Sequence, residues 1–389
     1  MAIVMGNAVV SHGGGPTAVL NSSLLGLIDG VRGSGVKRFW ASIGGLAGMA
    51  QVRCVDMLKI PHSTLIRAAQ QPGSYIRSFR GIITEEDIEQ FIHFCSRREI
   101  RYCFYAGGNG SMGTALRIAD VARKHRYDLI IVGVPKTVDN DICETDHCPG
   151  FGSAARFVVQ AVRDIGLDQR SLPSPVSIIE VMGRNTGWLA AASMLARYRK
   201  DAPPHFVYVP EIIFDPQEFL GRVDRLLTAQ GWAVGVVAEG LRDKSGRMIG
   251  ASGGSARDAK GRVLAGNCSI SLAALITRNL KVRARSEKPG LLCRALTACR
   301  SETDWMEAYE AGQAAARTAL AEQSAVMVML DRPRSGPYKC SYRLIPLSSV
   351  ANRERKLDSQ YLKRSLVDQS YVRYALPLVG EMPDAPVML

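Results

Sequence analysis

The fold is decided by the stretch Val134-Pro135-Lys136-Thr137-Val138-Asp139-Asn140-Asp141, which follows an apolar run over residues 129–132. The run predicts a buried strand of a parallel sheet, and Pro135 predicts its end because proline has no N–H to donate to a ladder. Ligands bind at the carboxyl ends of such strands. The ammonium group of Lys136 and the carboxylates of Asp139 and Asp141 are groups that phosphoryl transfer uses. The alternative is a surface turn in which Asp and Asn bond to their own backbone.

Two further glycine-rich turns favour the functional interpretation. A strand over 8–11 runs into Gly13-Gly14-Gly15-Pro16 before a periodic helix over 19–31, and a strand over 101–106 runs into a turn over 107–113 before a helix over 114–124. A glycine turn between a strand and a helix presents backbone N–H groups to phosphate. Glycine also occurs wherever a tight turn needs a positive φ, and neither turn has the Walker pattern. Repeated units of this kind predict a right-handed, mostly parallel sheet.

The second half of the chain repeats the pattern. A strand over 176–181 ends at Met182-Gly183-Arg184, and a strand over 233–238 ends at Glu239. An arginine at such a turn is well placed for a ligand phosphate. Further predicted strands lie over 38–43, 205–210 and 325–329, and further predicted helices over 85–98, 154–167, 189–197, 217–229, 269–280 and 305–320. We also expect a loop over 242–262 and a helical tail from residue 348.

Composition and charge point to a folded protein that binds small anions. Of the 389 residues, 47% are hydrophobic and 22% are charged, which fits two or three domains with ordinary cores. The net charge is +13. The arginines are spread along the chain and do not form clusters interleaved with aromatic residues. This distribution favours small phosphorylated anions over nucleic acid as partners.

The sequence also predicts a location. No apolar run approaches the ~20 residues that span a bilayer, and the first five residues lack the basic segment of a secretory signal. The nine cysteines are scattered without a C-x-x-C pair, which favours reduced thiols. Cys143, His147 and Cys148 match no zinc spacing, so we interpret them as part of a loop. We therefore expect a cytoplasmic protein that is not attached to a membrane.

Four segments together resemble the phosphofructokinase family. They are Gly13-Gly14-Gly15-Pro16, Gly107-Gly108-Asn109-Gly110-Ser111, the stretch from Pro135 to Asp141, and Glu180-Val181-Met182-Gly183-Arg184. Their order and spacing fit the family, and the likeness extends over residues 5–330. Lys136, together with residues 144–153 and 185–188, is most similar to the bacterial pyrophosphate-dependent branch.

The resemblance implies transfer of a phosphoryl group from pyrophosphate to the 1-hydroxyl of fructose 6-phosphate. Asp139 would accept the hydroxyl proton, while Lys136, Thr137 and Arg80 would stabilise the transferred group. Mg²⁺ would be held by Asp141 and Asn109. The donor would be bound by Gly14, Gly108, Asn109, Gly110 and Ser111, and the sugar phosphate by Thr137, Asp139, Met182, Gly183, Arg184, Glu239, Arg285 and Arg294.

Departures from the family pattern leave the donor open. Relatives carry an acidic residue for magnesium where this chain has Asn109-Gly110, and Gly110 leaves room that ATP could use. Other departures are Arg77, Pro175, Leu291 and Cys293. An ATP-dependent 6-phosphofructokinase and a non-catalytic paralogue that binds sugar phosphate are therefore alternatives. A lipid or NAD kinase shares a related glycine-rich turn but would lack the segments 135–141 and 182–184.

The fold that the resemblance implies is α/β, with two Rossmann-like three-layer α/β/α domains, mostly parallel sheets and an inter-domain active-site cleft. A phosphoryl-donor domain would comprise residues 1–150 and about 293–345. A sugar-phosphate domain with a C-terminal appendage would comprise residues 151–292 and about 346–389. Because the family forms dimers and tetramers, the resemblance also implies a homodimer or homotetramer.

Overall fold

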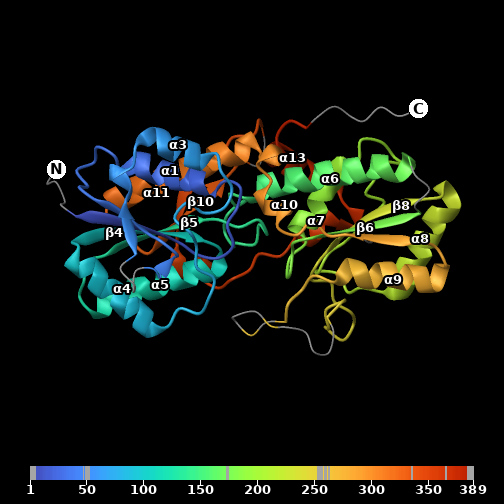
Figure 1. Cartoon of the computed structure of the whole chain (residues 1–389), viewed down its shortest axis with the longest axis horizontal. Helices are drawn as coiled ribbons and strands as arrows, with labels where there is room; N and C mark the ends of the chain where they lie inside the picture. The colour runs from blue at the N-terminus through green and yellow to red at the C-terminus, as the bar shows by residue number, and fades with distance from the viewer. Residues whose placement is uncertain are drawn as a thin grey trace. The chain divides into compact units, whose positions relative to one another are not determined.

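The computed structural model describes residues 6–46, 48, 53–171, 175–251, 257, 261, 263–333, 336–363 and 366–382. They form two compact units (Figure 1): unit 1 is Met1–Gly150 with Glu302–Arg355, and unit 2 is Phe151–Ser301 with Lys356–Leu389. The chain therefore leaves unit 1 after Gly150, returns to it at Glu302 and leaves it again after Arg355. Residues 1–5 and part of the predicted loop 242–262 lie outside the described residues. Which unit binds the donor and which the sugar phosphate stays a prediction.

Unit 1 is built on a seven-stranded sheet in the order β11-β10-β5-β4-β1-β2-β3. Its strands are β1 (Asn7–His12), β2 (Phe39–Ser42), β3 (Cys54–Asp56), β4 (Ile100–Gly107), β5 (Ile130–Pro135), β10 (Val326–Asp331) and β11 (Ser341–Pro346). The pairs from β10 to β2 are parallel, and the edge strands β3 and β11 are antiparallel. Every residue of β5 is buried, as expected for an apolar strand covered on both faces. The predicted mostly parallel sheet is confirmed.

Helices cover both faces of this sheet (Figure 1). One face carries α1 (Leu20–Val31), α3 (His62–Ala69) and α11 (Glu302–Leu320), and the other α4 (Glu85–Arg97), α5 (Asn109–Lys124) and the short α12 (Leu347–Val350). The strands alternate between two cores because successive side chains point to opposite faces. Phe104 and Val132 belong to the core under α1 and α11, whereas Cys103 and Ile131 belong to the core under α4 and α5. The 3-10 helix η1 (Met57–Lys59) follows β3.

Glycines allow α1 and α11 to cross closely. A Cβ added to Gly26 of α1 would lie 1.9 Å from Tyr309 O, and one added to Gly312 of α11 would lie 2.2 Å from Ser23 O. Any larger residue would therefore collide with backbone. α11 begins at Glu302, slightly before the predicted start at Trp305. Through this helix, the segment of unit 1 that begins at Glu302 packs against α1.

α5 begins earlier than the sequence predicts, at Asn109 rather than Thr114. Gly108 is the N-cap residue, and its carbonyl accepts from the N–H groups of Ser111 at 2.8 Å and Met112 at 3.0 Å. The glycine-rich sequence favoured a loop, but its residues form the first turn of the helix. Asn109, Gly110 and Ser111 therefore lie at a helix N-terminus.

Unit 2 contains a four-stranded parallel sheet in the order β7-β8-β6-β9. Its strands are β6 (Val176–Val181), β7 (Phe206–Tyr208), β8 (Ala233–Ala238) and β9 (Ala284–Glu287). On one face α8 (Pro216–Gln230) and α9 (Cys268–Leu280) share a hydrophobic core with the sheet, and α6 (Phe151–Ser171) packs against β6 and β8 on the other (Figure 1). The predicted α/β class holds for both units.

Short elements complete unit 2. They are α7 (Trp188–Ala192), η2 (Ser193–Ala196), α10 (Leu292–Ala295), η3 (Thr297–Cys299), η4 (Ser359–Tyr361), β12 (Leu362–Lys363), β13 (Leu366–Val367) and α13 (Gln369–Val379). The tail from residue 348 is only partly helical, because β12 and β13 form an antiparallel pair before α13 packs against α6. Within the described residues, no helix is both long enough and apolar enough to cross a membrane.

Candidate active site

The carboxyl ends of β1, β4 and β5 lie side by side because these strands are parallel neighbours in the sheet. Backbone hydrogen bonds join the turns that follow them. Gly13 N–H donates to Ala106 O at 2.8 Å, and Lys136 N–H donates to Gly107 O at 3.1 Å. The structure therefore brings together the three predicted segments of unit 1, around Gly14, around Asn109 and from Lys136 to Asp141.

The ammonium group of Lys136 is enclosed by the first glycine turn. Lys136 is 2% exposed, and its Nζ donates to Gly13 O at 2.9 Å and to Gly15 O at 2.6 Å. A buried cation needs such partners to offset its lost hydration. A Cβ added to Gly14, whose φ is +78°, would lie 3.5 Å from Nζ. The turn thus fixes one positive charge at the shared strand ends.

His12, the last residue of β1, is a neutral neighbour of this cation. Its ring is fully buried, and Nδ1 lies 2.8 Å from Ser74 Oγ. Burial, and after it the charge of Lys136, lowers the pKa of His12 from 6.5 to about 3. His12 therefore stays uncharged near neutral pH, and the positive charge of this turn comes from Lys136.

The loop that carries Arg80 is bonded to the first glycine turn. Gly14 N–H donates to Phe79 O at 2.9 Å, Phe79 N–H donates to His12 O at 3.3 Å, and Ser78 Oγ donates to Gly14 O at 2.7 Å. Arg80 follows directly and is exposed. The N–H of Gly14 is consequently used within the fold, so Gly14 admits a ligand through its missing side chain and not as a hydrogen-bond donor.

The second glycine turn supplies a helix N-terminus. The N–H groups of Asn109 and Gly110 lie in the first turn of α5, where the helix offers them no carbonyl, and such groups attract anions. Ser111 packs between the two turns. A Cβ added to Gly107 would lie 2.1 Å from Ser111 Oγ, and one added to Gly13 would lie 2.4 Å from it. Close approach of the turns therefore explains glycine at both positions.

Asn109 and Asp141, predicted to hold a metal, are in direct contact. Asn109 Nδ2 donates to Asp141 Oδ2 at 2.8 Å and to Asp141 O at 3.1 Å. Asn109 Oδ1 is buried and has no hydrogen-bond partner. Burial, followed by the charge of Glu354, raises the pKa of Asp141. An unused oxygen acceptor beside a half-buried carboxyl group fits a hard divalent cation such as Mg²⁺.

The loop that carries Asp139 is fixed on both sides. Asp139 N–H donates to Thr137 Oγ1 at 3.1 Å, and Thr137 N–H donates to Pro149 O at 3.2 Å. Asn140 is fully buried with a φ of +55°, a left-handed conformation that asparagine adopts more readily than most residues. Its Oδ1 accepts from Cys148 N–H at 3.0 Å. Asn140 therefore shapes the loop, while the half-buried Asp139 stays at its outer side.

In unit 2, the ends of β6 and β8 bring four predicted sugar-phosphate residues together. Val181 and Ala238 are partners in register, so Met182, Gly183 and Arg184 lie next to Glu239, whose N–H donates to Val181 O at 3.0 Å. Burial, and then the charge of Glu180, raises the pKa of Glu239, and the charge of Arg184 acts in the opposite direction. The cluster thus pairs a guanidinium group with a carboxyl group that is easily protonated.

Two further predicted arginines lie on other elements of unit 2. Arg285 lies on β9 opposite Ser177, four residues before the end of β6 at Val181, which corresponds to about 13 Å along a strand. Arg294 lies on α10, which packs against α6. The register of β9 places the backbone of Arg285 at the amino-terminal half of β6, and an apolar pattern cannot reveal that register.

Sequence reasoning missed the role of Glu180. This buried carboxylate accepts from both the N–H and the Oγ of Ser269, each at 2.8 Å, and so ties the end of β6 to the first turn of α9. The signal in the sequence was a carboxylate within an otherwise apolar strand. A carboxylate in a buried strand needs hydrogen-bond partners, so its presence indicates a structural contact.

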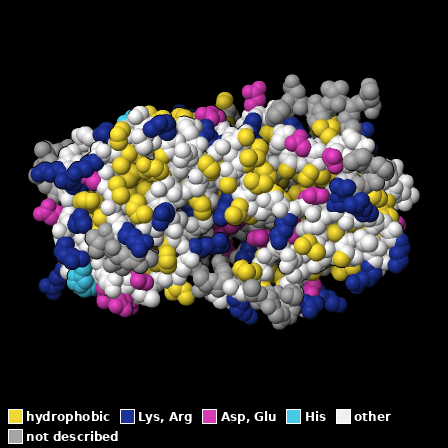
Figure 2. Space-filling model, in the orientation of Figure 1, with side chains coloured by type: hydrophobic (Ala, Val, Ile, Leu, Met, Phe, Trp, Pro, Cys, Tyr) yellow, Lys and Arg dark blue, Asp and Glu magenta, His cyan; other side chains and the backbone are white. Residues whose placement is uncertain are grey.

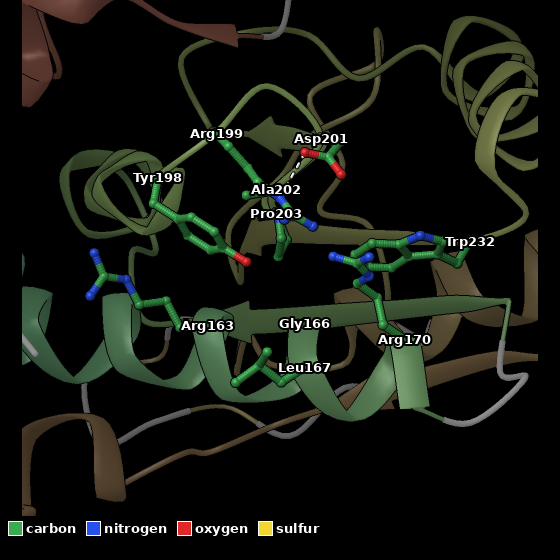
Figure 3. Close-up of a pocket in the computed structure, with 10 residues that line it drawn as sticks. All are labelled: Arg163, Gly166, Leu167, Arg170, Tyr198, Arg199, Asp201, Ala202, Pro203 and Trp232. Carbon is green, nitrogen blue, oxygen red and sulfur yellow. Dashed lines mark ion pairs between the residues drawn. The ribbon is translucent and has the colours of Figure 1, made fainter. Parts of the chain in front are cut away.

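A small pocket of unit 2 lies outside the candidate site (Figure 3). Among its lining residues are Arg163, Arg170, Tyr198, Arg199 and Trp232, and none of the predicted site residues lines it. Its volume of about 10 Å³ is room for about one water molecule. It is therefore too small for a sugar phosphate.

Comparison with known proteins agrees with this geometry of glycine turns and charged loops at strand ends. A family model described as phosphofructokinase matches residues 7–319. The pyrophosphate–fructose 6-phosphate 1-phosphotransferase of Xanthomonas campestris pv. campestris (strain B100) is 34% identical, over 97% of this chain and 93% of its own length. The enzyme of the same name from Rhodospirillum rubrum is 34% identical, over 98% of this chain and 96% of its own length.

A solved structure is similar along nearly the whole chain. The pyrophosphate-dependent phosphofructokinase from Marinobacter aquaeolei has a TM-score of 0.87 and 31% sequence identity, and the match covers 98% of this chain and 94% of that one. Fold and site thus define a two-unit α/β protein with glycine turns and charged side chains at its strand ends. The chain belongs to the phosphofructokinase family.

Proposed function

We propose that this protein transfers a phosphoryl group from pyrophosphate to the 1-hydroxyl of fructose 6-phosphate, giving fructose 1,6-bisphosphate and orthophosphate. The proposal follows the named activity of its relatives. The observation that carries it is the buried ammonium group of Lys136, fixed at the shared strand ends beside the loop of Asp139. In the transfer, a bond forms between the sugar oxygen and phosphorus as the bridging bond of pyrophosphate breaks.

The residues of unit 1 would act on the reacting groups. Asp139, half-buried on a loop fixed by Thr137 and Asn140, would accept the proton of the 1-hydroxyl. The charge of Lys136 and the exposed Arg80 would stabilise the transferred phosphoryl group, because positioning and charge carry most of phosphoryl-transfer catalysis. The first turn of α5 would bind the pyrophosphate oxygens that leave as orthophosphate.

Mg²⁺ would be held by Asp141 and the unused Oδ1 of Asn109. When bound, it would neutralise part of the charge on the donor phosphates. Asn109 supplies an oxygen but no charge, so Asp141 is the charged member of the pair. We therefore expect weaker Mg²⁺ binding than in a site with two carboxylates.

The residues at the strand ends of unit 2 would bind the sugar phosphate. Arg184 provides a guanidinium group suited to phosphate, and the carboxyl group of Glu239 can accept or donate a hydrogen bond to a sugar hydroxyl. Met182 and Gly183 line the same strand ends. Contributions of Arg285 and Arg294 stay predictions from the family resemblance.

The test is formation of fructose 1,6-bisphosphate from fructose 6-phosphate and Mg²⁺, with pyrophosphate in one assay and ATP in another. Turnover with pyrophosphate and not with ATP supports the proposal. Absence of turnover with both donors, in folded protein that still binds fructose 6-phosphate, would contradict it and favour the non-catalytic alternative.

One observation, the glycine at position 110, favours the alternative reaction with ATP. It is exposed in the first turn of α5, where an aspartate side chain would otherwise occupy space next to the donor. Turnover with ATP alone would make this open position, and not Lys136, the determinant of the donor.

Two further features belong to the proposal. All nine cysteines are free, which is consistent with a reducing cytoplasm. A homodimer or homotetramer is expected from the family resemblance, and size-exclusion chromatography with light scattering would measure it.

A further inference from the structure

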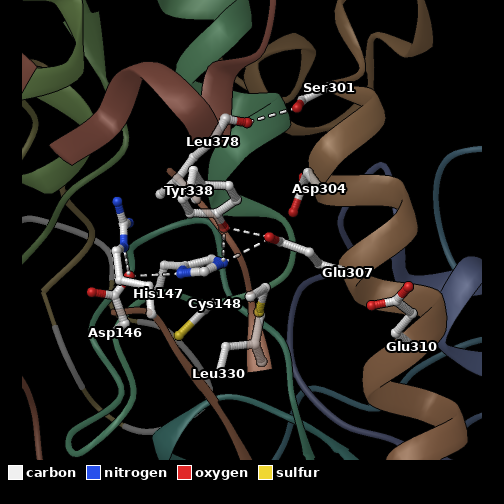
Figure 4. Close-up of polar contacts among 12 residues, drawn as sticks. Asp146, His147, Cys148, Ser301, Asp304, Glu307, Glu310, Leu330, Tyr338 and Leu378 are labelled. Carbon is white, nitrogen blue, oxygen red and sulfur yellow. Dashed lines mark hydrogen bonds and ion pairs between the residues drawn. The ribbon is translucent and has the colours of Figure 1, made fainter. Parts of the chain in front are cut away.

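Unit 1 contains a buried polar cluster that has no role in the reaction described above (Figure 4). His147 is 2% exposed, with Nδ1 2.8 Å from Asp146 Oδ2 and Nε2 2.7 Å from Glu307 Oε2. Tyr338 donates its hydroxyl hydrogen to Glu307 Oε1, and Arg332 Nε donates to Asp146 Oδ2 at 2.6 Å. The cluster joins the loop after Asp141 to α11 and to the end of β10.

The geometry favours an imidazolium at His147. Each ring nitrogen faces a carboxylate oxygen, and a neutral imidazole has only one N–H to donate. Burial by itself would lower the pKa of His147, but the charge of Glu307 and the hydrogen bonds to Asp146 and Glu307 outweigh burial and raise it. Burial would likewise raise the pKa of Asp146, yet the contacts with His147 and Arg332 lower it.

The other titratable groups around His147 do not replace its charge. Burial, and next the charge of Glu307, raises the pKa of Tyr338 and of the Cys340 thiol. Burial raises the pKa of Cys148 to about 12. These groups are neutral at physiological pH, so the positive charges that contact the two carboxylates come from His147 and Arg332, while the neighbouring Arg355 donates to the backbone carbonyl of Asp146.

A metal site is the competing interpretation of this cluster. His147, Glu307 and Cys340 each offer a ligand atom within 4.8 Å of the others. Two ligands bound to tetrahedral zinc at about 2.1 Å would lie about 3.4 Å apart. The distance of 2.7 Å between His147 Nε2 and Glu307 Oε2 is instead that of a charge-assisted hydrogen bond. The structure therefore favours the hydrogen-bonded network.

Hydrogen bonds fasten the segment around His147 to the rest of unit 1. Leu330 N–H donates to Thr145 Oγ1 at 2.9 Å, and Arg355 donates from one guanidinium nitrogen to Thr145 O at 2.5 Å and to Asp146 O at 2.6 Å. Gly150 N–H donates to Asp304 Oδ1 of α11 at 2.8 Å. Residues 145–150 are thus held at both ends.

The same segment holds the loop of Asp139. Pro149 O accepts from Thr137 N–H, and Cys148 N–H donates to Asn140 Oδ1. Cys148 and Pro149 directly follow His147 in the chain. The residues that directly follow His147 therefore make two hydrogen bonds to the loop that carries Asp139, while His147 itself lies outside that loop.

We propose that His147 is a positioning residue for the loop from Lys136 to Asp141, acting as an imidazolium held between Asp146 and Glu307. The proposal rests on the proposed phosphoryl transfer. When His147 loses its proton, one ring nitrogen turns a lone pair toward a carboxylate, and that contact changes from attraction to repulsion. The segment 145–150 then loosens, and the position of Asp139 with it. Transfer is therefore lost as pH rises through the ionisation of His147.

The first experiment measures kcat against pH for the wild type, Glu307→Gln and Glu310→Gln. Loss of an opposite charge lowers a neighbouring pKa by about 1 unit or more, so the alkaline decline of kcat should move to lower pH by about that amount in Glu307→Gln. Glu310 is the matched control, because it lies on the same helix but bonds to Tyr342 at 2.9 Å. Coinciding profiles for Glu307→Gln and the wild type would overturn the proposal.

The second experiment needs no substrate and so separates this proposal from the proposed function. The full chain, labelled with ¹⁵N in its six histidines, is compared with His147→Gln by NMR to assign the ring signals. We expect the His147 ring to keep protons on both nitrogens above pH 6.5, the ordinary pKa of histidine. A His147 ring that is already neutral at pH 6.5 would overturn the proposal even in a fully active enzyme.

A kinetic comparison distinguishes positioning from a purely structural role. In His147→Gln, kcat should fall about 10- to 100-fold, because a misplacement of about 1 Å costs rates of that order, while the KM for each substrate changes little. The alkaline decline should also disappear, since the ionising group is gone. An unchanged kcat would overturn the proposal, and if His147→Gln does not fold, the NMR of the wild type and the Glu307→Gln profile still decide.

Discussion

The strand ends of the two units enclose different ionisable groups. In unit 1 the buried group is the ammonium of Lys136, enclosed by the carbonyl oxygens of Gly13 and Gly15. In unit 2 the groups are the buried carboxyl of Glu180 and the half-buried carboxyl of Glu239, at the ends of neighbouring strands. Both edges use the same geometry of parallel strands and glycine turns, so the difference lies in the side chains that the turns enclose.

The strand ends of the two units are therefore suited to different ligands. A fixed cation suits a ligand whose reacting part is a phosphate, because its charge is in place before the ligand arrives. Carboxyl groups suit sugar hydroxyls, which donate and accept hydrogen bonds, and Arg184 adds the single positive charge that a terminal phosphate needs. That the phosphoryl donor binds unit 1 and the sugar phosphate binds unit 2 is a prediction from the family resemblance, and this difference in side chains fits it.

The largest loss of activity is expected from substitution of Asp139 in unit 1. Asp139→Asn keeps the shape of the side chain but removes the base, so kcat with pyrophosphate should fall by about 10²- to 10⁴-fold, which is the usual contribution of a general base. The matched control is Glu144→Gln, an exposed carboxylate later in the same loop, which should keep wild-type kcat. Circular dichroism checks that both variants are folded. Residual turnover within tenfold of the wild type would exclude Asp139 as the base.

The second prediction removes the buried cation. Lys136→Met leaves Gly13 O and Gly15 O without the ammonium group, and each unsatisfied buried acceptor costs about 1–3 kcal/mol. The free energy of unfolding in urea should therefore fall by about 2–5 kcal/mol, and kcat by about 100-fold. Lys124→Met, on an exposed ion pair with Glu85, is the control and should change neither quantity. Unchanged stability of Lys136→Met would show that the carbonyl contacts do not hold the turn.

The third prediction tests whether Gly110 determines the use of ATP as donor. Gly110→Asp places a carboxylate in the first turn of α5, where it interacts favourably with the helix dipole, so stability should be kept. The side chain occupies space near the donor, and kcat/KM for ATP should fall at least about tenfold. Kinetics with pyrophosphate provide the internal control and should be retained. Equal ATP kinetics in the variant and the wild type would disprove the steric argument.

The smallest expected effect concerns the carboxyl groups of unit 2. The pKa of Glu239 is raised above 4.5 by burial and then by Glu180, so the folded state binds this proton more tightly than the unfolded state. The stability that it contributes is complete below pH 4.5 and is lost as pH rises through the raised pKa. Glu239→Gln should flatten the dependence of Tm on pH in that window, because glutamine does not titrate. Parallel Tm curves would mean that the pKa of Glu239 is not raised.

The sequence predicts the strand ends well, because the apolar runs and the glycines that end them are local signals. β5 ends at Pro135 and β6 ends at Val181, directly before Met182, as the runs predict. The start of α5 is predicted too late, since Gly110 and Gly113 lower helix propensity and Gly108 gives no recognisable cap. Tertiary packing of Ser111 between two turns stabilises that first helical turn, and propensity contains no information on such packing.

Relations over long sequence separations are the part that pattern reasoning cannot supply. Glu307 meets His147 across 160 residues, and neither residue has a spacing that indicates the other. The position of Arg285 depends on the register between β9 and β6, which an apolar pattern leaves undetermined. By contrast, the contact between Asn109 and Asp141 follows from the neighbouring ends of β4 and β5, and the parallel-sheet prediction already implied it.

The return of the chain to unit 1 at Glu302 has a consequence for synthesis on the ribosome. α11, β10 and β11 complete unit 1, yet they are translated after the whole of Phe151–Ser301. At roughly 5–20 residues per second, His147 waits roughly 8–30 s for Glu307 to be made. During that interval the nascent unit 1 exposes the apolar edge of β5 and the face of α1 that carries its glycines. Chaperones that bind nascent chains therefore have the most time to bind these two surfaces. By contrast, Phe151–Ser301 already contains the whole four-stranded sheet of unit 2.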